Sequence, residues 1–290
     1  MVSREERRKA AEQRRRVVRR QRRGLAFAVL LVLAAVATIV ATSAGRKGGA
    51  RASAGARAPV RARPRPPAVD RVLGYTDYVL AGSPRRREVA LTFDDGPGPY
   101  TAKVLAILRR THTDATFFPV GRPIGAFPRG LAGVRRAGFP VGDHTMTHPL
   151  MGHLGAGAQA GEIDGQARLL TRHEIAYPRF FRPPDGSFDG TTRALLQRRR
   201  MLMVLWSVNP EDYFRPGAAQ IVGRVMRGAR PGAIVLMHDG GGDRSQTVAA
   251  LPTIIRRLHA RGLTPVSIPQ LLQDDPPPHH QPPPPNLAGV

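Results

Sequence analysis

Short apolar runs alternate with amphipathic stretches between residues 70 and 273. Uninterrupted apolar runs predict strands buried on both faces, whereas apolar positions three and four apart predict helices packed on them. The predicted strands cover residues 89–93, 115–120, 140–143, 179–182, 201–206, 233–238 and 264–268. The predicted helices cover residues 101–110, 128–137, 159–173, 191–199, 218–227 and 247–261. This order indicates the α/β class, and we expect a distorted (β/α)7-type barrel.

Polar clusters follow five of these strands at their carboxyl ends. The active sites of barrels of parallel strands lie at that end, so we expect the clusters to converge on one site. They are TFDDGP at 92–97, HTMTH at 144–148, RPPDG at 182–186, WSVNPEDY at 206–213 and LMH at 236–238.

The N-terminal region has a different pattern from the predicted domain. Residues 1–23 are rich in arginine, and the uncharged apolar run of 24–45 has the length of about 20 residues that a membrane-spanning helix needs. The positive-inside rule keeps the basic segment in the cytoplasm, so we expect a single-pass signal anchor with the domain outside the cell membrane. A cleaved signal peptide is the alternative, because small residues at 42–44 offer a cleavage site. Both interpretations export the domain.

Segments of biased composition flank the domain. Residues 46–69 are rich in Arg, Pro and Ala and predict an extended linker, while residues 274–290 predict a Pro-rich disordered tail. His279 and His280 lie in this tail, where we expect a solvated segment and no metal site. The predicted domain is therefore 70–273.

Charge and cysteine content narrow the chemistry. The formal net charge is +24, but most of it precedes residue 66 and no known nucleic-acid-binding module accompanies it, so we expect no nucleic-acid partner. The chain has no cysteine, which excludes disulfides and thiolate metal ligands. A metal ion would have to be bound by histidines and carboxylates. The sequence does not indicate an oligomeric state.

Each polar cluster also has an ordinary structural explanation. Asp-Asp-Gly-Pro after a strand is a frequent turn sequence. His144 and His148 share a face if the chain is helical there, as two metal ligands require, but such pairs are common on surfaces. A single histidine at a strand end, such as His238, most often belongs to the core. The significance of the clusters lies in their combination.

In this order and spacing, the five clusters resemble the motifs of NodB-type polysaccharide deacetylases, carbohydrate esterase family four. The resemblance covers roughly residues 88–272. It implies a metal-dependent hydrolase that removes N-acetyl groups from N-acetylglucosamine-containing polysaccharide, either peptidoglycan or chitin-like oligomers. It also implies that Asp95, His144 and His148 are the metal ligands. This ligand set suits Zn²⁺, which is the divalent metal that we expect, but two histidines and a carboxylate also suit Fe(II), so the residue types alone do not fix the metal.

The resemblance implies roles for further residues. Asp94 would act as general base on the metal-bound water, and His238 would act as general acid on the leaving amine. Arg182 would hold Asp94, and Asp212 would orient His238. The backbone N–H of Asp185 would stabilise the oxyanion.

Substrate-binding roles would fall to Asp185, Trp206, Tyr213 and Leu236, with a role in the structural core as the alternative for Trp206 and Leu236. Three positions depart from the usual motifs, because Asp185 stands where an aromatic residue or glycine is common, Asn209 replaces an Asp and Tyr213 replaces a Trp. The metal, base and acid positions are intact, so we expect the departures to affect substrate preference rather than chemistry.

Two other functions remain open at this stage. The same machinery could remove O-acetyl groups from xylan or a similar polymer. A deacetylase-like barrel could also bind wall glycan without hydrolysing it, although the intact Asp94, Asp95, His144, His148 and His238 argue against this.

Overall fold

The computed structural model describes residues 67–282. Among these residues no helix is long and apolar enough to cross a membrane. The predicted anchor at 24–45, the basic segment before it, most of the linker and residues 283–290 lie outside the described part.

Strand β2 (Glu88–Asp94) is buried along its whole length and forms the centre of one parallel sheet. Strand β6 (Ile234–His238) pairs with one edge of β2 and brings His238 level with Asp94. The other edge is shared, because β3 (Thr116–Phe118) pairs with the C-terminal half of β2 and β7 (Thr264–Val266) with its N-terminal half. The C-terminal ends of β2, β3 and β6 therefore lie on one side.

A second parallel sheet has the order β1 (Tyr78–Val79), β5 (Leu202–Val204) and β4 (Phe180–Phe181). Isolated bridges connect it to the first sheet. They pair Phe117 with Val141, Asp143 with Phe181, Ala81 with Ala233 and Val208 with Val235. The paired segments close an irregular ring, in agreement with the α/β class and the distorted barrel expected from the sequence.

Residues 140–143 differ from the prediction of a strand, because they form only isolated bridges. Pro140 has no N–H to donate to a ladder. Gly142 lies against Phe118, whose ring would be 2.3 Å from a Cβ at this position. The close approach of the backbone to Phe118 leaves no room for the side chain of a regular strand residue.

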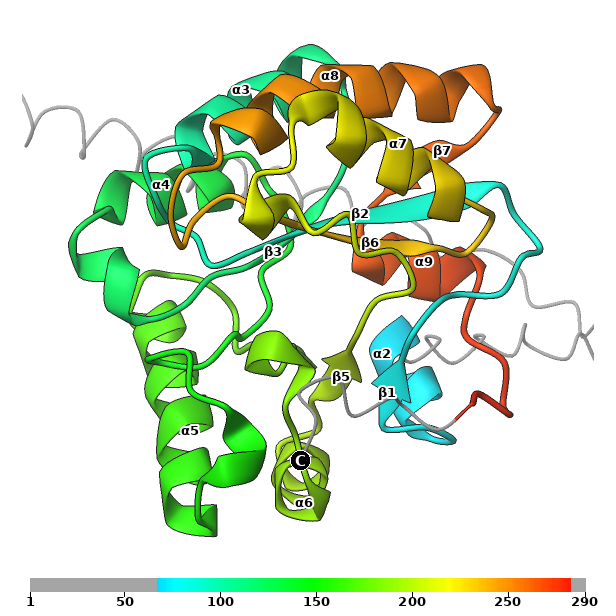
Figure 1. Cartoon of the computed structure of the whole chain (residues 1–290). Helices are drawn as coiled ribbons and strands as arrows, with labels where there is room; N and C mark the ends of the chain where they lie inside the picture. The colour runs from blue at the N-terminus through cyan, green and yellow to red at the C-terminus, as the bar shows by residue number, and fades with distance from the viewer. Residues whose placement is uncertain (1–66, 283–290) are drawn as a thin grey trace, which may run out of the picture. The chain divides into compact units, whose positions relative to one another are not determined.

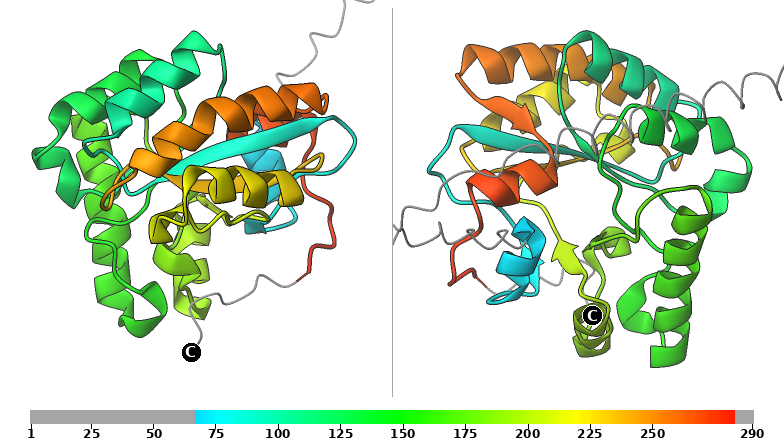
Figure 2. Two further views of the ribbon diagram at one scale, coloured as in Figure 1. Left: turned by 45° about the horizontal axis from the view of Figure 1, so that its top comes forward. Right: turned by 180° about the vertical axis from the view of Figure 1, so that it is seen from behind.

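The helices surround these strands, and most follow the predicted amphipathic stretches. Figure 1 shows α3, α7 and α8 along one side of β2 and β6, with α5 and α6 beside the second sheet. Figure 2 shows α7 and α8 packed side by side. The longer helices are α3 (Thr101–Arg110), α4 (Pro128–Arg136), α5 (Ala156–Arg172), α6 (Gly190–Arg198), α7 (Ala218–Gly228) and α8 (Ser245–Ala260). The short ones are α2 (Ala68–Leu73), α9 (Ile268–Asp274) and the 3-10 helices η1 (Arg122–Gly125), η2 (Met151–His153), η3 (Pro184–Gly186) and η4 (Asp212–Phe214).

The C-terminal tail differs from the expected disordered segment as far as residue 282. The Tyr75 hydroxyl donates to the carbonyl of Pro277 at 2.8 Å, and the ring of His279 stacks on Tyr75 with centroids 4.0 Å apart. The side chain of Gln281 donates to the carbonyl of Tyr78 and accepts from the N–H of Leu80. With α2 and α9, these contacts extend the packed unit beyond the predicted limits of 70 and 273.

Candidate active site

The predicted site residues converge at the C-terminal ends of the strands. Asp94 ends β2, His238 ends β6, and the histidines of the second cluster follow the bridged residues 141–143. A hollow of about 400 Å³ lies between them. It is lined by Asp94, Asp95, His144, His148, Pro183, Asp185, Trp206, Asn209, Tyr213, Leu236 and His238. Of the predicted residues only Arg182 and Asp212 are absent from the lining, because both are buried behind it.

Three side chains in the hollow have the arrangement of metal ligands. Oδ1 of Asp95 lies 3.6 Å from Nε2 of His144 and 3.3 Å from Nε2 of His148. Ligand atoms that lie about 2.0–2.2 Å from a tetrahedral Zn²⁺ are separated from each other by about 3.3–3.6 Å. Oδ1 of Asp95 is buried and has no hydrogen-bond partner among the described residues, as expected of an atom meant to coordinate an ion. The three residues therefore fit a divalent metal.

Neighbouring groups fix these three side chains in position. Nδ1 of His144 lies 2.7 Å from the carbonyl oxygen of Arg182 and must donate to it, which leaves Nε2 free to coordinate. Asp95 and His148 have φ values of 67° and 65°, a strained backbone conformation that is typical of functional sites. Burial raises the pKa of Asp95, but the adjacent imidazole of His144 more than offsets this and holds the pKa well below its ordinary value. The carboxylate is therefore ionised, as a metal ligand must be.

Asp94 is held by a fully buried arginine. Nη1 of Arg182 donates to Oδ1 of Asp94 at 2.7 Å and to the hydroxyl of Thr92 at 2.8 Å. Nε of Arg182 donates to the carbonyl of Val204 at 2.9 Å. Charges are rarely buried unless they are paired and hydrogen-bonded, so these contacts indicate that Arg182 serves to fix one carboxylate oxygen. The other oxygen of Asp94 is left to act in the hollow.

His238 has a corresponding partner in Asp212. Nδ1 of His238 lies 2.7 Å from Oδ1 of Asp212, while Oδ2 of Asp212 accepts from the backbone N–H of His238 and from the hydroxyl of Thr247. This arrangement places a proton on Nδ1 and leaves Nε2 as the second titrating nitrogen. Burial lowers the pKa of His238, but the hydrogen bond and charge of Asp212 more than offset it, so the pKa is raised. The imidazole is suited to donate a proton near neutral pH.

The rim of the hollow contains the three departures from the usual motifs. Asp185 is exposed, has a φ of 52°, and its N–H has no backbone partner within the described residues, so the donor is free for a ligand. Nδ2 of Asn209 donates to the hydroxyl of Tyr213 at 3.3 Å. The ring of Tyr213 meets the His238 imidazole edge-on, with centroids 5.3 Å apart. Asn209 and Tyr213 therefore act together as one wall beside His238.

Sequence reasoning missed the residues behind Asp95. The carboxylate of Asp239 is buried, accepts from the hydroxyl of Thr101, and has its pKa raised to about 7 by burial. A Cβ at Gly241 would lie 2.4 Å from Oδ2 of Asp95, so only glycine allows this loop to pack on Asp95. Arg244 is also buried and donates to the carbonyls of Gly240 and Gly241. The sequence HDGGGDR at residues 238–244 could have indicated these residues, because the motifs assign no role to its glycines and its arginine.

Comparisons with known proteins agree with the resemblance found in the motifs. The sequence model of the polysaccharide deacetylase family matches residues 81–204. A peptidoglycan-N-acetylglucosamine deacetylase of Bacillus cereus is 36% identical over 202 residues, covering 68% of this chain and 94% of the relative. A chitooligosaccharide deacetylase of Bradyrhizobium sp. is 37% identical over 198 residues, covering 64% of this chain and 90% of the relative. A solved peptidoglycan N-acetylglucosamine deacetylase superimposes with a TM-score of 0.66 and 30% identity, covering 70% of this chain and 95% of that structure.

Proposed function

The chain belongs to the polysaccharide deacetylase family and is a hydrolase, and on this basis we propose that it removes N-acetyl groups from N-acetylglucosamine units of a wall polysaccharide. One observation carries the proposal. Two groups that can transfer protons, each held by its own buried partner, lie beside the same three candidate metal ligands. Asp94, which is held by Arg182, and His238, which is held by Asp212, both line the hollow that contains Asp95.

A divalent ion bound by Asp95, His144 and His148 would supply a nucleophile at neutral pH, because it lowers the pKa of a water molecule that it binds. Two histidines and a carboxylate suit Zn²⁺, which we propose as the metal. The loop at Gly240 and Gly241 packs against one side of Asp95 and blocks it. Substrate must therefore approach Asp95 from the hollow.

The remaining groups account for the proton transfers. Asp94 accepts a proton as the water oxygen attacks the carbonyl carbon of the N-acetyl group. The free N–H of Asp185 donates to the oxygen that becomes negatively charged. His238 then donates a proton to the amide nitrogen, the carbon–nitrogen bond breaks, and acetate and the free amine leave.

Substrate contacts come from the walls of the hollow. Trp206 is half-buried, Leu236 is almost fully buried, and Tyr213 presents a ring beside His238. These apolar and aromatic surfaces suit the acetyl methyl group and the face of a sugar ring. We propose that the exposed carboxylate of Asp185 contacts the next sugar unit at the rim.

The contact of His238 with Asp212, which prepares His238 to donate a proton, favours an amide over an ester substrate. An alcohol is a far better leaving group than an amine, so hydrolysis of an O-acetyl group depends less on a proton donor. We expect acetate release from N-acetylglucosamine oligomers to exceed release from O-acetylated xylan, and His238→Ala to reduce the first more than the second. Equal losses on both substrates, or activity confined to xylan, would reject the amide assignment.

We also propose that residues 24–45 anchor the enzyme in the cell membrane with residues 67–282 outside. The support is the arginine-rich segment before a long uncharged apolar run. A polysaccharide of the cell wall would then lie within reach of the domain through the linker that precedes residue 67.

A further inference from the structure

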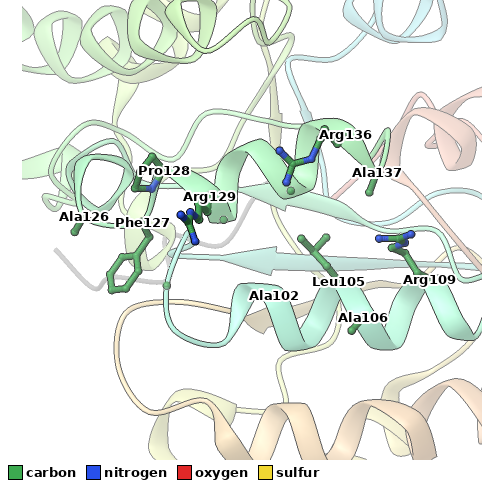
Figure 3. A pocket seen from close by; sticks show the side chains of 13 residues that line it. Ala102, Leu105, Ala106, Arg109, Ala126, Phe127, Pro128, Arg129, Arg136 and Ala137 are labelled. Atoms are coloured by element: carbon green, nitrogen blue, oxygen red, sulfur yellow. The ribbon is translucent and has the colours of Figure 1, made fainter. Parts of the chain in front are cut away.

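A second hollow of the domain lies away from the active site. It has a volume of about 1020 Å³ and runs between α3 and α4. Figure 3 shows α3 and α4 on its two sides, with arginines at both ends. Its floor and walls are mostly small or apolar, from Ala102, Leu105 and Ala106 on α3 and from the two glycines of α4. We call this hollow the arginine groove.

The spacing of the residues explains the shape of the groove. Ala102 and Arg109 are seven residues apart on α3, as are Arg129 and Arg136 on α4, so each pair lies on one face of its helix. Seven residues of helix extend over about 10 Å. Arg129 thus lies near one end of the groove and Arg109 near the other end, while Arg136 lies further along α4 than Arg129 does (Figure 3).

The three arginines of the groove have no acidic partner within residues 67–282. The neighbouring Arg135 does have one, because it contacts Glu174 and is not part of the groove lining. Several unpaired guanidinium groups around one hollow create a positive potential that attracts an anion. Guanidinium groups bind carboxylates through paired hydrogen bonds in one plane.

One end of the groove lies close to Asp95 in the chain. Gly98 lines it and is three residues after Asp95, so the two lie within about 11 Å of each other along the chain. Phe127, which is 38% exposed, lies at the Arg129 end of the groove (Figure 3), where Gly130 of α4 lies against Pro97. A molecule in the groove could therefore be covalently part of a polymer whose sugar occupies the active site.

We propose that the arginine groove binds an acidic peptide attached to the glycan substrate, so that peptide-bearing wall glycan is preferred over bare glycan. The inference rests on the proposed deacetylase function. An extended peptide covers about 3.3 Å per residue, so carboxylates about three residues apart reach both ends of the groove. The short side chains between them pack on Ala102, Leu105 and Ala106.

Other anionic ligands fit the groove less well. A polymer with a phosphate in every unit would place charge against Leu105, where burial without a partner is costly. A membrane surface requires protruding apolar groups, whereas this surface is hollowed. A bare sugar chain would leave the guanidinium groups of Arg109, Arg129 and Arg136 without an anion.

The test compares two substrates with the same sugar chain, one bare and one carrying acidic peptides, using the full-length, metal-loaded protein. The groove variant is Arg109→Gln with Arg136→Gln. The matched control is Arg110→Gln with Arg135→Gln, which removes the same charge from the same two helices outside the groove lining. We expect the ratio of kcat/KM, peptide-bearing to bare, to fall about three- to tenfold in the groove variant through KM, the scale of two partly exposed ion pairs. The control should keep the wild-type ratio, and high salt should remove the difference between the variants.

Several results would overturn the inference. Equal ratios in the wild type and the groove variant would do so, as would an equal fall in the control. Direct titration with a short two-carboxylate peptide and with inorganic polyphosphate adds a separate readout. Tighter polyphosphate binding that Arg109→Gln and Arg136→Gln abolish would assign the groove to phosphate polymers instead. Absence of acetate from both glycans would refute the proposed function, whereas acetate release with no effect of the peptide refutes only the groove.

Discussion

Replacing Asp212 by asparagine removes the charge behind His238 while keeping the size of the side chain. Asp212 is almost fully buried. Its carboxylate accepts hydrogen bonds from Nδ1 of His238, from the backbone N–H of His238 and from the hydroxyl of Thr247. The raised pKa of His238 depends on this carboxylate, because burial alone lowers it. Asparagine can also present its NH₂ group to Nδ1, which would favour the wrong tautomer.

The size of the effect follows from the buried hydrogen bond. A hydrogen bond to a charged group contributes about 1.5–3 kcal/mol, which corresponds to a factor of about 10 to 150 in the population of protonated His238. In the proposed mechanism His238 is the acid, so activity should be present below its pKa and be lost as the pH rises through that pKa. Asp212→Asn should therefore move the basic limb of the profile to lower pH, and should reduce kcat by about 10- to 150-fold on that limb.

The assay is acetate release from N-acetylglucosamine oligomers, measured as kcat and kcat/KM across the pH range. Thr247→Val is the matched control, because it removes one hydrogen bond to Asp212 but leaves the carboxylate and His238 in contact. We expect the control to shift the basic limb less than Asp212→Asn does. An unmoved basic limb in a folded, metal-loaded Asp212→Asn protein would refute the role of His238 as the acid.

Three further predictions concern the base, the rim and the anchor. Asp94→Asn should reduce turnover by about 10²–10⁴ while metal content, measured by elemental analysis, stays near that of the wild type; normal turnover would remove Asp94 from the mechanism. Asp185→Tyr should keep activity but shift preference from partly to fully acetylated oligomers, because the carboxylate attracts a free amine by about 0.2–1 kcal/mol. An unchanged ratio of kcat/KM at low and high salt would show that Asp185 only shapes the turn. Protease added to intact cells should remove the domain and spare the N-terminus, and a domain digested only after lysis would contradict export.

The sequence predicted the fold where a local pattern determines it. The strands of the central sheet and the six longer helices follow apolar periodicity, which depends on a few neighbouring residues. Residues 140–143 have an apolar pattern too, but Pro140 and the contact of Gly142 with Phe118 prevent regular pairing. Helix α2 is too short for periodicity to identify it.

Long-range contacts explain the rest of the differences. The tail packs on the domain because the Tyr75 hydroxyl donates to the carbonyl of Pro277 and the Tyr75 ring stacks on His279. These contacts join positions about 200 residues apart in the chain. In the site, the motifs identified the residues that face the hollow. The motifs did not identify Arg244, because its function depends on backbone carbonyls that it reaches only in the folded loop.

The most direct test of the account is acetate release by the full-length protein before and after metal removal. Acetate from N-acetylglucosamine oligomers or peptidoglycan should disappear on exhaustive chelation and return on addition of Zn²⁺ or another divalent transition ion. The Asp95→Ala protein should bind the ion weakly and stay inactive after the same addition. Full activity in chelated protein with no detectable metal would contradict the central claim that Asp95, His144 and His148 hold a catalytic ion.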